Sequence, residues 1–179
     1  MAFIMKKFLL ISTLLAFTGM VRADAPIQLS LTPDIAIFPR TETVRGFSLG
    51  IWSENPQSSL TLGFINGSAE DSSGLTAGIV NYGENYQGVQ WALVNVYSGN
   101  VVGWQASTMN MVQGSFEGFQ SGIVNISQDV SGVQVGLVNY AESLRGFQLG
   151  VVNIAENNSW FNDFPDQLAT GFPVLNWSF

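Results

Sequence analysis

Apolar and polar residues alternate with a period of two along most of the chain. The alternation is clearest in three similar segments, GFQSGIVNI (118–126), GVQVGLVNY (132–140) and GFQLGVVNI (146–154). Large apolar residues take every second position in each segment, and Gly or Gln takes most of the others. Because successive side chains of a strand point to opposite faces, this period predicts β-strands and an all-β fold.

These segments belong to eight repeats of 13–15 residues, which span about residues 46–158. The segments between them, such as YAESL and ISQDV, hold turn-forming residues and most of the charges. The repeats start at Gly46, Ser59, Gly74, Gly88, Gly103, Gly118, Gly132 and Gly146.

Two polar residue types recur at fixed positions of the repeat. The third position is glutamine in five copies, and the eighth is asparagine in seven. The glutamines form a candidate lumen or ladder column, Gln90, Gln105, Gln120, Gln134 and Gln148, and the asparagines form a column at the strand ends, Asn66, Asn81, Asn95, Asn110, Asn125, Asn139 and Asn153.

Two architectures satisfy this pattern. In an antiparallel barrel each repeat is one strand and a turn, whereas in a parallel β-solenoid each repeat is one coil. The alternation over residues 130–140 corresponds to a strand of ~36 Å at ~3.3 Å per residue. Tilted by ~45°, such a strand rises ~25 Å, which matches the apolar band of an outer-membrane barrel. A solenoid has to bend the strand at the fifth-position glycine. We therefore expect an antiparallel up-and-down transmembrane β-barrel, with the solenoid as the alternative.

The two ends of the chain complete the expected barrel. Residues 27–38 and a closing strand at about 171–179 raise the number of strands to about ten. Leu175, Trp177 and Phe179 lie on one face of the closing strand, and this pattern resembles the carboxy-terminal assembly signal of bacterial outer-membrane barrels. In the barrel, the Phe/Leu/Val face contacts lipid and the glutamine column lines a polar lumen. Pro33 and Pro173 count against the barrel, because both fall inside these terminal strands.

Residues 1–23 have the pattern of a secretory signal peptide. Lys6 and Lys7 precede an apolar run at 8–21, and small residues lead to a cleavage site after Ala23. The run is shorter than the ~20 residues that a transmembrane helix needs. We expect residues 24–179 to form a single domain that is secreted across the inner membrane to the outer membrane or cell surface.

The composition of the chain excludes several classes of function. The chain is 46% hydrophobic and 11% charged, and without the leader it keeps three arginines, no lysine and 13 acids, a net charge of −10. This charge argues against nucleic-acid binding. The lack of His and Cys excludes Ser-His-Asp and Cys-His catalysis and the usual zinc sites. We expect an outer-membrane or surface β-barrel protein with a structural or narrow pore-forming role, without catalysis and without a cofactor. The alternative is a secreted, soluble β-solenoid that acts as an adhesin or surface binding module. The expected partners are the lipid bilayer and the outer-membrane assembly machinery, and a small-molecule ligand is left open.

The repeated G-x-Q-x-G-x-V-N unit, the opening PIQLSL and the closing NWSF resemble the bacterial surface-repeat proteins first named from spirochaetes. The resemblance covers roughly residues 26–179. It implies a secreted, surface-associated or outer-membrane protein, and it brings no catalytic residue. The early repeats depart from the pattern, with Ser or Thr in place of Gln and Ser53 in place of Asn.

Each candidate site has a structural interpretation as well as a functional one. The glutamine column could bind sugars, but a hydrogen-bonding column is the preferred interpretation. The acidic pairs Glu70–Asp71 and Asp163/Asp166 lack calcium-loop spacing, and we expect them in solvated loops. The aromatic residues of WFNDFP (160–165) are expected to anchor the protein at a membrane interface.

Overall fold

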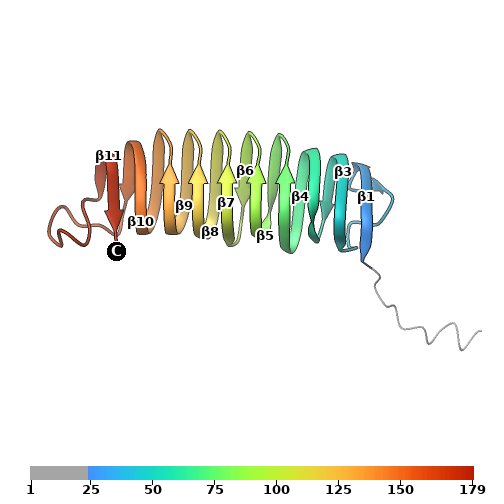
Figure 1. Ribbon diagram of the computed structural model, residues 1–179, viewed down its shortest axis with the longest axis horizontal. Coiled ribbons are helices and arrows are strands. Elements are labelled where there is room, and N and C mark those ends of the chain that lie inside the picture. Colours follow the sequence, from blue (N-terminus) through green and yellow to red (C-terminus); the bar gives the residue numbers. More distant parts are fainter. Residues whose placement is uncertain (1–23) are drawn as a thin grey trace, which may run out of the picture.

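The computed structural model describes residues 24–179 and forms an elongated parallel β-solenoid, in which the chain advances one coil at a time from β1 to β11 (Figure 1). The all-β prediction is confirmed. The antiparallel barrel of about ten strands is wrong, because neighbouring coils pair in parallel. The predicted signal peptide lies outside the described residues.

The described residues form eleven strands. Their bounds are β1 Ala25–Thr32, β2 Ile35–Ala36, β3 Val44–Asn55, β4 Gln57–Ala77, β5 Val80–Trp91, β6 Val94–Tyr97, β7 Val101–Ala106, β8 Met109–Ser121, β9 Val124–Val135, β10 Val138–Ala155 and β11 Gly171–Ser178.

The register between coils follows the sequence repeat. Gly118 pairs with Gly103 on one side and with Gly132 on the other, and Gln120 pairs in the same way with Gln105 and Gln134. Equivalent residues therefore stack in columns along the solenoid. The alignment of the repeats made from the sequence is the alignment that the backbone hydrogen bonds use.

Each coil has a triangular cross-section. Residues 118–131 form one coil and serve as the example. Face A comprises 118–122, face B 123–127 and face C 128–131. The corner between faces C and A lies at Gly118, where φ is 131° and an added Cβ would approach the Gly103 carbonyl oxygen to 2.1 Å. A side chain at position 118 would not fit this bend. The predicted 36 Å strand is thus bent at the first- and fifth-position glycines, as the solenoid alternative required.

The interior is half polar. The inward residues of this coil are Gln120, Asn125, Ser127 and Val130. Apolar packing is confined to the side of the interior nearest face C. Its members are Tyr86, Tyr97, Val101, Val112, Phe116, Val130, Ala141, Leu144 and Ala155.

The two end strands do not continue the parallel pattern. β11 pairs antiparallel with β10, and at the other end β2 folds back antiparallel onto β1. The predicted strand at 27–38 is in fact two strands, because Pro33 lies in the turn between them. These short antiparallel pairs cover part of each open edge, which limits end-to-end pairing with other chains.

Candidate functional site

The glutamine column lies inside the solenoid. All five side chains are fully buried. Gln120 Nε2 donates to Gln105 Oε1 at 2.8 Å, and the chain of hydrogen bonds continues to Gln148 with N–O distances of 2.8–2.9 Å. Within residues 24–179 these glutamines line no lumen, because their side chains are fully buried, so that part of the prediction is wrong. The ladder that we preferred as the structural interpretation is present from Gln105 to Gln148, whereas the buried side-chain amide of Gln90 has no hydrogen-bond partner in the described part of the chain. The burial of the column leaves no access for a sugar.

The asparagine column forms a second, longer ladder beside the first. Six hydrogen bonds of 2.8–2.9 Å join the seven side chains from Asn66 to Asn153, each Nδ2 donating to the next Oδ1. Most of these Nδ2 atoms also donate to a backbone carbonyl of face A, for example Asn125 to Val135 at 3.0 Å. The column therefore lies behind the corner between faces A and B, in the interior.

The outward residues of faces A and B are apolar, and they remain exposed. Amides fill the interior behind faces A and B, so the large apolar side chains that alternate with them there point to the outside. Leu137 is 54% exposed and Leu149 is 41% exposed. In the barrel that we expected from the sequence, these residues face lipid. The solenoid turns them outward too.

The two apolar faces meet along a ridge at the corner that follows the fifth-position glycine. Backbone hydrogen bonds join successive ridge residues directly, as from Leu137 N to the Ile123 carbonyl at 2.9 Å. The large apolar ridge residues are exposed, and Val151 reaches 63%. We call this column the A–B ridge, and it consists of Ile51, Phe64, Ile79, Leu93, Thr108, Ile123, Leu137 and Val151.

Aromatic residues flank the two apolar faces at their outer margins. On face A, next to the corner with face C, the rings of Trp104 and Phe119 pack edge to face at 6.4 Å, and Phe147 packs in the same way on Phe179 at 5.2 Å. At the outer margin of face B stand Tyr82 and Tyr140.

Both marginal tyrosines bond to carboxylates. The Tyr82 hydroxyl donates to Glu54, and the Tyr140 hydroxyl donates to Glu156 at 2.7 Å. Partial burial and the bond to Glu54 raise the pKa of Tyr82 to about 12. The bond to Glu156 is the main reason that the pKa of Tyr140 is raised to about 12. Both hydroxyls are therefore neutral hydrogen-bond donors at physiological pH.

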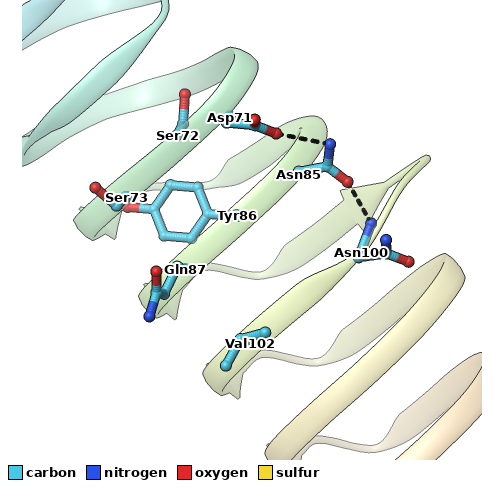
Figure 2. Close-up of a pocket in the computed structure, with 8 residues that line it drawn as sticks. All are labelled: Asp71, Ser72, Ser73, Asn85, Tyr86, Gln87, Asn100 and Val102. Atoms are coloured by element: carbon cyan, nitrogen blue, oxygen red, sulfur yellow. Dashed lines mark hydrogen bonds between the residues drawn. The ribbon is translucent and has the colours of Figure 1, made fainter.

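Face C is polar and carries a surface pocket with a cavity volume of about 480 Å³. Figure 2 shows its side chains on three successive coils. Asp71 Oδ1 accepts from Asn85 Nδ2 at 2.9 Å, and Asn85 Oδ1 accepts from the backbone N–H of Asn100 at 2.7 Å. The single carboxylate of the pocket is thus bonded to a neighbouring turn. This arrangement stabilises the stacked turns and presents no paired acid and base.

The predicted acidic clusters form no metal centre. Between residues 24 and 179, no three acidic side chains gather closely enough to hold an ion. Asp163 instead accepts hydrogen bonds from Ser159 and Gln167 at 3.2 and 3.0 Å, which fold the loop before β11.

The carboxy-terminal residues singled out in the sequence continue the outer surface. Leu175 and Trp177 pair with Leu149 and Phe147 of β10, and so extend face A by one strand. The Trp177 ring lies 6.2 Å from Phe164, which is exposed together with Trp160 and Phe161. The aromatic residues of 160–165 therefore lie exposed beside the last strand. Their role as an anchor and the assembly-signal role of Phe179 remain predictions.

Sequence reasoning missed the core residues and the ridge. Phe116 and Leu144 are buried, yet they lie in the segments between repeats that we had assigned to turns. The available signal was the single large apolar residue that stands two positions before most repeat glycines. The ridge was hidden because Ile123 and Val124 both point outward at the corner, which interrupts the period of two.

Comparison of the chain with family models, curated proteins and solved structures gave no match. The surface-repeat resemblance therefore remains a prediction. In residues 24–179 there is no helix with the length and apolarity to span a membrane.

Proposed function

We propose that this chain is an exported, non-catalytic β-solenoid that acts as a binding module at the bacterial surface, with faces A and B as its binding surface. The observation that carries the proposal is the continuous exposed apolar surface of these two faces. Monomeric soluble proteins rarely expose apolar patches larger than ~300–600 Å². With eight coils spaced ~4.8 Å apart and a face ~16 Å wide, each of the two faces covers ~600 Å².

The distribution of charge supports the same assignment. Within residues 57–154 the outward positions of faces A and B contain no charged side chain. The acids of these coils lie on face C and its turns, as with Glu117, Asp129 and Glu142. One side of the solenoid is thus suited to water and the other to an apolar partner.

Export and surface location rest on the leader-like pattern of residues 1–23 and on the surface-repeat resemblance. Neither needs a barrel. The absence of His and Cys, together with the internal bonding of the polar columns, supports a role without catalysis. Recognition of Phe179 by the outer-membrane assembly machinery is part of the same proposal.

Cysteine labelling in the cell envelope tests the binding surface without knowledge of the partner. The chain has no natural cysteine, so Leu137→Cys on the ridge and Ser131→Cys on face C each give one reporter thiol. Both positions are exposed in the isolated protein, and a water-soluble maleimide should label both there. In envelopes that contain the exported protein, we expect Cys at 137 to be protected and Cys at 131 to react. Equal labelling of the two in envelopes would refute the assignment.

A further inference from the structure

We propose that the partner of faces A and B is the acyl-chain region of a lipid layer, into which the A–B ridge inserts while face C stays in water. This inference rests on the proposed function and specifies its partner. It is carried by the shape of the apolar surface, by the order of residue types across it and by the placement of charge.

The shape of the surface favours a fluid partner. The two apolar faces slope away from a convex ridge, on which Phe64, Leu93 and Val151 are 57–63% exposed. A second copy of the chain would meet this one through the same patch on both, and a flat interface of that kind covers one face and leaves the other exposed. Acyl chains can cover both slopes of the ridge at once.

The order of residue types across the surface matches the depth profile of a membrane interface. Six of the eight ridge positions are Ile, Leu or Val. Four of the eight marginal positions of face A are aromatic, and two of the eight on face B are tyrosines. These residues are Phe47, Trp104, Phe119 and Phe147 on face A and Tyr82 and Tyr140 on face B. Trp and Tyr prefer the headgroup level, and aliphatic side chains lie deeper.

A protein partner predicts the opposite order. Binding hot spots at protein interfaces are rich in Trp, Tyr and Arg and cluster near the centre of the interface. Here the centre is mainly aliphatic and holds no arginine. Three aromatic residues depart from this order, because Trp91 and Trp52 lie beside the ridge and Phe64 lies on it.

The charges indicate which lipid surface is suitable. No lysine is present after the leader, and Arg40, Arg45 and Arg145 lie outside the outward columns of faces A and B. Binding therefore cannot depend on attraction to anionic headgroups, and the acids of face C oppose it. We expect the protein to prefer zwitterionic lipid and to bind with little dependence on salt.

Vesicle flotation of the purified chain without its leader tests the proposal. With phosphatidylcholine vesicles, we expect the wild-type chain to float, and we expect weaker flotation when half of the lipid is phosphatidylglycerol. The double variant Ile123→Asn/Leu137→Asn should lower the partition coefficient at least about tenfold, because two exposed aliphatic side chains no longer enter the acyl region. Ser131→Asp on face C of the same region is the matched control and should float like wild type.

A fluorescent label on the two cysteine variants gives a second readout that does not depend on affinity. An environment-sensitive dye at position 137 should shift to the blue with phosphatidylcholine vesicles, and the same dye at 131 should not. Circular dichroism and urea unfolding establish that each variant is folded before it is compared.

Three results would overturn the lipid partner. They are an absence of flotation, flotation that the ridge variant leaves unchanged, and a lipid-free dimer that protects Cys at 137 from maleimide. If Cys at 137 is protected in envelopes but unaffected by vesicles, the binding surface stands and its partner is not lipid.

Discussion

At the scale of single residues, the interior depends on amides that satisfy one another. Asn125 accepts a hydrogen bond from Asn110 and donates to Asn139, each at 2.8 Å, and it also donates to the Val135 carbonyl. A buried polar group that loses its partner costs about 1–3 kcal/mol. The repeat therefore needs Asn at its eighth position for a reason internal to the fold, and no ligand is required to explain the column.

The ladder predicts a large effect of one amide. Asn125→Ala removes three hydrogen bonds and leaves donors and acceptors on neighbouring residues unpaired, so we expect the free energy of unfolding to fall by about 2–4 kcal/mol. Urea denaturation monitored by circular dichroism measures the change. Gln128→Ala, on the exposed side of the same coil, is the control and should change stability by less than about 0.5 kcal/mol. Equal midpoints for the two variants would contradict a stabilising ladder.

At the scale of the element, the coil depends on the bend at the first-position glycine. Gly132 has φ of 145°, and a Cβ there would lie 2.0 Å from the Gly118 carbonyl oxygen. Neither the backbone conformation nor the space admits a side chain. The same glycine in sequence marks the repeat, and in the structure it turns face C into face A.

This bend predicts an asymmetry between two glycines of the chain. Gly132→Ala should destabilise the protein by at least about 3 kcal/mol, because an unfavourable φ and a backbone clash add together. At Gly171, the first residue of β11, the nearest atom to an added Cβ is 3.9 Å away, so Gly171→Ala should cost about 1 kcal/mol or less. Urea unfolding of both variants gives the comparison. A Gly132→Ala protein as stable as wild type would show that the coil does not need this corner.

The sequence repeat alone predicts much of the structure of one coil. The glycine, glutamine and asparagine columns gave the strands and their register, because equivalent residues pair in successive coils. The repeat could not show in the same way which face of the strand points into the interior. A period of two says that two faces differ and does not say which one is inside. We placed the apolar face outward only because the barrel needs a lipid contact, and the solenoid also exposes Leu137 and encloses Gln120 and Asn125.

The same limit explains the error in architecture. An alternating run of 11 residues looks like one straight strand when its glycines are treated as small strand residues. Gly118 and Gly122 act instead as corners, and at the second corner Ile123 and Val124 point outward in succession. The backbone angle of a glycine is not encoded in the alternation. For that reason the sequence left barrel and solenoid as alternatives, and we chose the wrong one.

At the scale of the whole molecule, each coil contacts only the coils before and after it. The parallel pairs run from β1 to β10 with local register shifts, such as the one between Val112 and Ser115, and within residues 24–179 only the end strands β2 and β11 pair antiparallel (Figure 1). In such a fold, stability is approximately a sum of repeat terms and interfaces between neighbours. The solenoid can therefore gain or lose whole coils without a change of fold, provided that every column stays in register.

A change of length by one coil is the sharpest test of this organisation. Residues 118–131 form one complete coil, and their deletion would place Gly132 on Gly103, Gln134 on Gln105 and Asn139 on Asn110. We expect this shorter chain to fold with a lower urea midpoint. Duplication of the same 14 residues after Ser131 should fold with a higher midpoint, because it adds one more interface between coils.

A shuffled insert of identical composition at the same site is the control for duplication. It lacks the glycine corners and the amides in register, so it should loop out and leave the midpoint unchanged or lower. Cooperative unfolding followed by circular dichroism and by tryptophan fluorescence would report on the whole molecule in each case. If the duplicated coil and the shuffled insert gave the same midpoint, the columns would not be the source of stability. If the two differ as expected, stability is added coil by coil, and each added coil also lengthens the A–B ridge by one position.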